Sequence, residues 1–138
     1  MPEANFLVVD DTLVALQLLA EKHRAQYQIP VVGITGSNGK TVVKEWLSQL
    51  LGTDLRVARS PRSYNSQIGV PLSVWQMEEH TEVALIEAGI SRHNEMKRLR
   101  SIIRPTIGVL TNIGGAHQEN FSSLQDKCME KLDLFRDC

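Results

Sequence analysis

The stretch Gly33-Ile34-Thr35-Gly36-Ser37-Asn38-Gly39-Lys40-Thr41 constrains the fold of this chain more than any other feature. An apolar run at residues 29–34 leads into it, and a helix-like run at residues 42–51 follows it. A strand, a glycine-rich turn with a lysine, and a helix form the layout of a phosphate-binding loop, in which glycines let successive backbone N–H groups point at one anion. The N-terminal amides of the helix add to the same attraction. The sequence therefore predicts a loop that binds phosphate.

Each residue of this loop has an expected role. The candidate nucleotide-binding residues are Gly36, Ser37, Asn38, Gly39, Lys40, Thr41 and Val42. The ammonium of Lys40 can reach the outer phosphates, and the hydroxyl of Thr41 can bind Mg²⁺. The strict loop pattern has a glycine five positions before Gly39, whereas this chain has Ile34 there. The alternative is an ordinary strand-to-helix turn with an exposed lysine.

The composition indicates a globular protein and excludes several classes of function. The 138 residues are 42% hydrophobic and 22% charged, which is enough for one domain with a core. The net charge of −1 argues against a general nucleic-acid surface. No apolar run approaches the length of a membrane span or of a signal-peptide core. We therefore expect no nucleic-acid partner, no membrane insertion and a cytoplasmic location. Cys128 and Cys138 lack the spacing of a disulfide framework or a metal site.

Short apolar runs alternate with helical patterns along the chain. Strands are expected at residues 31–35, 55–58, 83–86 and 107–110, and helices at residues 12–27, 42–51, 92–102 and 122–135, with a further helical start in residues 68–77. The runs at 83–86 and 107–110 are continuous and apolar, which is typical of strands buried on both faces. This order predicts an α/β fold with a mostly parallel sheet and helices on both faces, like that of P-loop NTPases.

Polar residues follow three of the predicted strands, at Thr35, Glu87 and Thr111-Asn112. Because ligands of an open parallel sheet bind beyond the carboxyl ends of its strands, we expect these residues to meet beside the glycine loop. Glu87 is then a candidate Mg²⁺ ligand, the alternative being a glutamate that caps a helix or faces solvent. His117, in the glycine-rich turn after the last strand, is a weaker candidate for a metal or phosphate contact, because a lone histidine is usually structural.

The last predicted helix carries a lysine on its apolar side. Its inward stripe is predicted at Leu124, Cys128, Leu132 and Phe135. Lys131 falls on the same side by helical spacing, where a lysine must reach solvent with its tip, form a pair, or lose its charge. A lysine that reaches solvent is the simplest interpretation. Lys127 and Glu130 are expected to face solvent.

Together these stretches resemble the Mur ligases, ATP-dependent amide-forming enzymes of peptidoglycan synthesis. The resemblance covers residues 9–135 and rests on the glycine loop, on Asn65 with Ile68-Gly69-Val70-Pro71, and on residues 86–89 and 111–117. Lys44-Glu45 and residues 65–71 are most similar to the MurF type, which joins D-alanyl-D-alanine to a UDP-N-acetylmuramoyl-tripeptide. Residues 60–71 further resemble the form that is fused to an alanine racemase.

The resemblance implies roles at the nucleotide and metal sites. Residues 36–41 match the ATP phosphate loop of the family. Thr41 and Glu87 match its Mg²⁺ ligands, and His117 matches a ligand of a second metal ion. ATP and Mg²⁺ are therefore the implied cofactors.

The resemblance also implies catalytic and substrate-binding residues. Lys131 matches the lysine that Mur ligases carbamylate with CO₂, which gives a carboxylate-like metal ligand. With Lys40 and His117 it completes the implied catalytic set. Asn65 matches a residue near the reacting phosphate and the acyl substrate. The chain departs from many members at residues 62–64, where they are rich in glycine and asparagine.

The implied reaction has two steps. ATP phosphorylates the terminal carboxylate of the UDP-N-acetylmuramoyl-tripeptide, and the amine of D-alanyl-D-alanine then displaces phosphate to form the peptide bond. We expect residues 1–28 to be a linker and helix leading in from an N-terminal domain, and residues 29–138 to be the first part of the ATP-binding central domain. The chain alone is then expected to have little or no ligase activity. A folylpolyglutamate synthetase-like ligase and a non-catalytic module with the same fold remain as alternatives.

Overall fold

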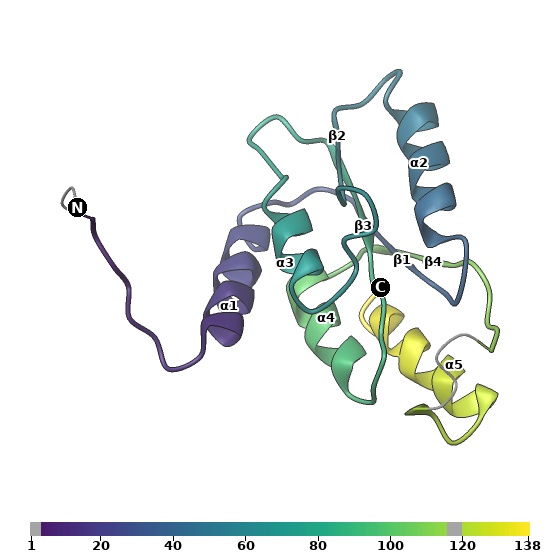
Figure 1. Cartoon of the computed structure of the whole chain (residues 1–138). Coiled ribbons are helices and arrows are strands. Elements are labelled where there is room, and N and C mark those ends of the chain that lie inside the picture. Colours follow the sequence, from purple (N-terminus) through teal and green to yellow (C-terminus); the bar gives the residue numbers. More distant parts are fainter. Residues whose placement is uncertain (1–3, 116–119) are drawn as a thin grey trace.

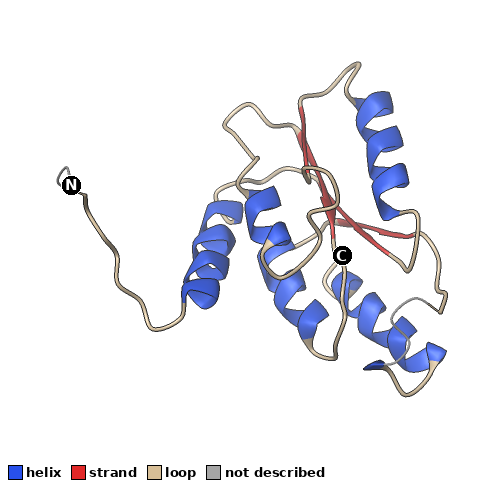
Figure 2. Cartoon of the chain, viewed as in Figure 1, coloured by secondary structure: helices blue, strands red, loops and turns tan. Residues whose placement is uncertain are grey.

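The computed structural model describes residues 4–115 and 120–138, which form a parallel sheet between two layers of helices (Figures 1 and 2). The elements in chain order are α1 (Thr12–Arg24), β1 (Val31–Thr35), α2 (Lys40–Leu51), β2 (Val57–Arg59), α3 (Gly69–Val74), β3 (Val83–Glu87), α4 (Glu95–Ile103), β4 (Ile107–Leu110), α5 (Leu124–Leu132) and the 3₁₀ helix η2 (Asp133–Phe135). The predicted α/β class with helices on both faces is confirmed.

The order of the strands in the sheet is β2-β3-β1-β4, and every neighbouring pair is parallel. β1 lies between β3 and β4, with Ile34 opposite Glu87 and Thr35 opposite Leu110. The carboxyl ends of these three strands therefore lie together at one end of the sheet. The polar residues that follow the strands in the sequence lie at this end.

The two faces of the sheet are covered unequally. α2 covers one face, where Leu47 and Leu51 pack against a small core around Ile34 and Leu85. The other face carries the larger core, which is built by α3, α4 and η2, and α1 packs on α3 and α4 (Figure 1). None of the helices in the described parts of the chain has the length and apolar character needed to cross a membrane.

α1 is fixed at both ends. The carboxylate of Asp11 caps the helix by accepting hydrogen bonds from the backbone N–H groups of Leu13 and Val14. At the other end, buried Arg24 donates to the carbonyl oxygens of Ile103 at 2.7 Å and Arg104 at 2.9 Å. The helix ends at Arg24 rather than near residue 27. The division of the chain into a linker and helix at residues 1–28 and part of a central domain at residues 29–138 remains a prediction.

The expectation that residues 107–110 form a fully buried strand is wrong. Ile107 is 49% exposed and Leu110 is 37% exposed. Within the described chain β4 is an edge strand, paired only with β1. An apolar run alone does not show whether a strand has neighbours on both sides.

The predicted inward stripe of the last helix is also wrong in part. Leu124 and Leu132 are exposed, whereas Lys127 and Lys131 are buried, together with Leu134 in η2. The inward position predicted for Lys131 is confirmed, but its side chain is buried and does not reach solvent, contrary to the simplest interpretation. The solvent-facing position predicted for Lys127 is wrong. The buried positions follow an i, i+4, i+7 spacing that places two lysines above the glycine loop.

The buried face of this last helical segment predicts that Leu134 and Leu132 contribute unequally to the stability of the fold. Leu134→Ala removes a fully buried side chain, and the free energy of unfolding is expected to fall by about 2–5 kcal/mol. Leu132→Ala, at a side chain that is 39% exposed, is expected to lower it by less than about 1 kcal/mol. Urea denaturation of both variants measures the difference, and equal losses would contradict the assignment of the buried face.

Candidate phosphate and metal site

The glycine loop connects β1 to α2 in a conformation that depends on two glycines. Gly36 has a φ of +142° and Gly39 a φ of +80°, and residues other than glycine rarely adopt these backbone angles. Gly39 is the N-cap residue of α2, so Lys40 and Thr41 lie in the first turn of that helix. The loop thus ends at a helix N-terminus, where unpaired backbone N–H groups favour an anion.

Lys40 folds back over the loop. Its Nζ donates a hydrogen bond to the carbonyl oxygen of Gly36 at 2.8 Å. Burial lowers the pKa of Lys40, the nearby carboxylate of Glu87 opposes this shift, and Lys127 adds to it. Lys40 is therefore not the exposed lysine that the alternative of an ordinary strand-to-helix turn predicts.

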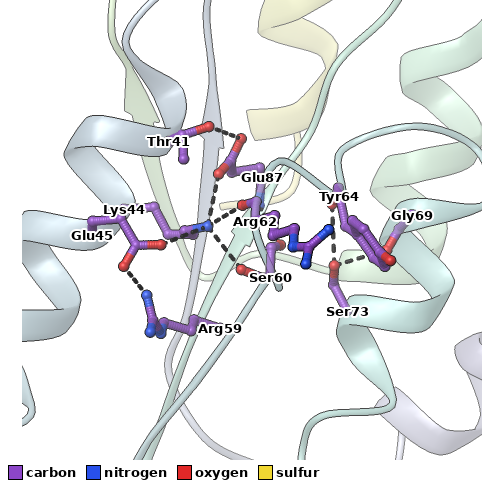
Figure 3. Close-up of polar contacts among 10 residues, drawn as sticks. All are labelled: Thr41, Lys44, Glu45, Arg59, Ser60, Arg62, Tyr64, Gly69, Ser73 and Glu87. Carbon is purple, nitrogen blue, oxygen red and sulfur yellow. Dashed lines mark hydrogen bonds and ion pairs between the residues drawn. The ribbon is translucent and has the colours of Figure 1, made fainter.

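The predicted convergence of Thr41 and Glu87 is present. The hydroxyl of Thr41 donates to Oε2 of Glu87 at 3.1 Å, and the side chain of Glu87 is fully buried (Figure 3). Lys44 Nζ lies 3.1 Å from Oε1, an ion-pair contact that lacks hydrogen-bond geometry. Oε1 of Glu87 therefore has no hydrogen-bond partner among the described residues. The buried hydroxyl of Thr35 has none among them either.

These oxygens fit the ligand chemistry of Mg²⁺. A hard divalent cation prefers carboxylate and hydroxyl oxygens, and Mg²⁺ is usually held by one or two carboxylates together with substrate phosphates. Residues 4–115 and 120–138 contain no cluster of three or more His, Cys, Asp or Glu side chains that could hold a metal by themselves. A site with Thr41 and Glu87 as its described protein ligands thus suits an ion that arrives with a phosphate.

The segment after β4 shapes the loop from the other side. Asn112 accepts the backbone N–H of Asn38 on its side-chain oxygen at 3.0 Å and the N–H of Ser37 on its carbonyl oxygen at 2.9 Å. Ser37 also exchanges hydrogen bonds with the backbone of Gly114. Asn112 had no assigned role in the sequence, and here it supports the loop conformation.

Two buried lysines of α5 reach the glycine loop and the segment after β4. Nζ of Lys131 donates to the carbonyl oxygen of Gly36 at 3.1 Å, and Nζ of Lys127 donates to that of Gly114 at 2.6 Å. Burial lowers the pKa of Lys131 to about 8, and the positive charges of Lys40 and Lys127 contribute to the shift. His117, the predicted ligand of a second metal ion, lies outside the described residues.

A cavity of about 320 Å³ opens beside the loop. Its lining includes Lys40, Lys127 and Lys131 together with Asn65 and Gln67. The backbone oxygen of Asn65 accepts the N–H of Gly89 at 2.7 Å, which fixes this residue beside the end of β3. The structure thus brings Asn65 to the same cavity as Lys40, Lys127 and Lys131, and its role beside the acyl substrate stays a prediction.

Two residues of the site were not predicted from the sequence. Lys127 was expected to face solvent, and Lys44 was used only as a mark of family resemblance. Lys44 has the i, i+3, i+7 spacing to Leu47 and Leu51 that defines the sheet-facing side of α2, and this spacing is the signal that could have identified it.

The similarity to known proteins agrees with this geometry. Residues 34–138 match the family model described as the Mur ligase middle domain. The UDP-N-acetylmuramoyl-tripeptide–D-alanyl-D-alanine ligase of Bacillus subtilis (strain 168) is 40% identical over 128 residues, which are 93% of this chain and 28% of that protein. The protein of the same name from Synechocystis sp. is 39% identical over 114 residues, covering 83% of this chain and 25% of its own length.

Solved structures show the same likeness. Crystal structure I of MurF from Acinetobacter baumannii superposes with a TM-score of 0.89 at 31% identity, over 95% of this chain and 29% of that one. The MurF ligase of Thermotoga maritima, solved in complex with ADP, gives a TM-score of 0.87 at 30% identity, over 99% of this chain and 32% of its own. The chain spans less than a third of the length of each of these relatives. From its family match and its fold, the chain belongs to the Mur ligase family, with relatives of the MurF type.

Proposed function

We propose that this chain supplies the phosphate- and Mg²⁺-binding part of an ATP-dependent ligase that adds D-alanyl-D-alanine to a UDP-N-acetylmuramoyl-tripeptide. The observation that carries the proposal is the convergence of the glycine loop, the Thr41–Glu87 contact and the buried lysines at one sheet edge. The relatives named above carry that activity in their names, and one was solved with ADP. The cytoplasmic location expected from the sequence remains a prediction.

The residues of this chain have distinct tasks in the proposed reaction. The backbone N–H groups at the start of α2 and the ammonium of Lys40 hold the phosphates of ATP while the tripeptide carboxylate attacks the outer one. Thr41 and Glu87 would hold Mg²⁺, which offsets the negative charge of the phosphates when it is bound. Asn65, in the same cavity, would orient the acyl phosphate for the D-alanyl-D-alanine amine.

Lys131 has the properties that carbamylation requires. The reaction with CO₂ needs a neutral amine, and a pKa of about 8 gives a much larger neutral fraction at neutral pH than the ordinary value of 10.5. The carbamate would replace a buried cation with an anion that can bind metal. We propose this role for Lys131 on the basis of its burial and of the family resemblance.

The nucleotide-binding proposal predicts that the chain binds Mg²⁺–ADP through Lys40. Calorimetry is expected to show binding that Lys40→Ala weakens by roughly tenfold or more, because a charge-assisted hydrogen bond to phosphate is lost. Lys97→Ala, at an exposed position of α4, is the control and is expected to leave binding unchanged. Binding that survives Lys40→Ala would contradict the assignment of the loop.

A second experiment distinguishes the ligase types. In a protein of the length of its relatives that carries this chain, we expect turnover of a UDP-N-acetylmuramoyl-tripeptide with D-alanyl-D-alanine. Turnover of a folate with glutamate instead would favour the folylpolyglutamate synthetase alternative. Loss of nucleotide binding in the long protein would favour a non-catalytic module.

The lowered pKa of Lys131 predicts a pH dependence of stability. Below about pH 8 the folded and unfolded states both hold the proton, and the folded state bears the cost of a buried cation. Between about pH 8 and 10.5 the folded state has released the proton and the unfolded state keeps it, so the free energy of unfolding rises with pH.

Lys131→Met removes the buried cation, so the variant is expected to be more stable than the wild type at neutral pH. This difference in the free energy of unfolding is expected to shrink as pH rises through that window. Urea denaturation at pH 7, 8, 9 and 10 measures the difference between the two proteins. Lys97→Met serves as the exposed control, for which a difference independent of pH is expected. A constant difference for Lys131→Met would contradict the shift in pKa.

A further inference from the structure

The fully buried ammonium of Lys44 lies where three parts of the site meet. It donates hydrogen bonds to the carbonyl oxygens of Ser60, at 2.8 Å, and of Arg62 (Figure 3). It also lies 3.1 Å from a carboxylate oxygen of Glu87 and 3.1 Å from one of Glu45. One cation of α2 thus contacts both the end of β3 and the segment that follows β2.

Lys44 and Glu87 interact mainly through their charges. Lys44 has three N–H groups and four oxygen neighbours, and two of the N–H groups are used by the carbonyl oxygens. Its contact with Oε1 of Glu87, at 3.1 Å, is an ion pair without hydrogen-bond geometry. Lys44 supplies positive charge to the buried carboxylate and leaves this oxygen available for another ligand.

The segment at residues 60–65 is tied to β3 by its backbone as well. The hydroxyl of Ser60 accepts the N–H of Glu87 at 3.0 Å, and the N–H of Ser60 donates to the carbonyl oxygen of Leu85. At the other end of the segment, Asn65 accepts the N–H of Gly89. Lys44 adds the only side-chain contacts from α2 to this segment among the hydrogen bonds of the described residues.

We propose that Lys44 is a positioning residue, which holds the carboxylate of Glu87 and the segment at residues 60–65 in a fixed relation. In this way Lys44 sets the distance between the Mg²⁺ ligand Glu87 and Asn65 in the cavity. The proposal rests on the proposed function, because it takes Glu87 as a ligand of Mg²⁺. Lys44 acts through these residues and itself contacts neither metal nor nucleotide.

A neighbouring ion pair provides the matched control. Glu45 also contacts Lys44 and pairs with Arg59 on the outside of α2, but their side chains are 35% and 45% exposed. Such exposed pairs are screened by solvent and contribute little to stability. Glu45→Gln therefore removes one charge beside Lys44 without affecting the contacts to Glu87 and the segment at residues 60–65.

The experiment compares ADP binding with and without Mg²⁺ in the whole chain, by calorimetry. Lys44→Met is expected to weaken Mg²⁺–ADP binding by roughly tenfold or more and metal-free ADP binding by less than about threefold, because the glycine loop is untouched. In the Glu87→Gln background, Lys44→Met is expected to cause less than about a threefold further loss, since both changes act on one interaction. Glu45→Gln is expected to bind like the wild type.

Two results would overturn the positioning role: equal losses with and without Mg²⁺, or a loss of the same factor in both backgrounds. Circular dichroism checks that each variant folds, and Lys44→Gln, which keeps a donor, is the second variant. If neither variant folds, Lys44 is a purely structural residue.

Hydrogen exchange separates failure of this proposal from failure of the proposed function. Without any ligand, Lys44→Met is expected to speed amide exchange at residues 60–65 and to leave residues 36–41 unchanged. A wild-type chain that binds no nucleotide would count against the proposed function, and the exchange data would still decide on Lys44. Unchanged exchange at residues 60–65 in a folded Lys44→Met variant would overturn the proposal.

Discussion

The parallel pairing of β1 with strands on both sides is the constraint on which the rest of the structure depends. Because β1 lies between β3 and β4 and pairs Ile34 with Glu87, its carboxyl end meets the carboxyl ends of both neighbours. The glycine loop leaves the sheet at that point, so it is surrounded by a carboxylate on one side and by Asn112 on the other. Chain connectivity alone would not bring together residues that are far apart in the sequence; the register of the ladders does.

Charge is distributed unevenly around this edge. Lys40, Lys127 and Lys131 line the cavity beside the loop. Lys40 and Lys131 donate hydrogen bonds to the carbonyl oxygen of Gly36, and Lys127 donates one to that of Gly114. At Lys131 a neutral partner satisfies the donor but does not cancel the charge, so the cost of burying this cation falls when an anion binds. Lys44 differs from Lys131, because its ammonium lies 3.1 Å from the buried carboxylate of Glu87.

The places where sequence patterns misled have a common physical reason. Helical spacing and apolar character identify which residues share a face, but the direction of that face depends on the neighbouring elements. In α5 the apolar residues suggested a face through Leu124 and Leu132, whereas the packed face carries Lys127 and Lys131. Lys131 is buried against a carbonyl oxygen of the glycine loop and Lys127 against one of the segment after β4, and no local pattern encodes these partners. The same reasoning applies to β4, which in the described chain is an edge strand that pairs only with β1.

The sequence by itself determined the α/β class and the glycine loop and identified Lys40, Thr41 and Glu87 as candidate residues, because these depend on local turn chemistry, strand and helix periodicity and residue type. Lys131 became a candidate through the family resemblance. Only the tertiary structure decided that Glu87 contacts Thr41 and Lys44, that Lys127 is buried, and that Asn65 lines the same cavity as the loop lysines. Those contacts join elements far apart in the chain. Their geometry follows from strand order and from the packing of α2 and α5, which are properties of the whole fold and of no single segment.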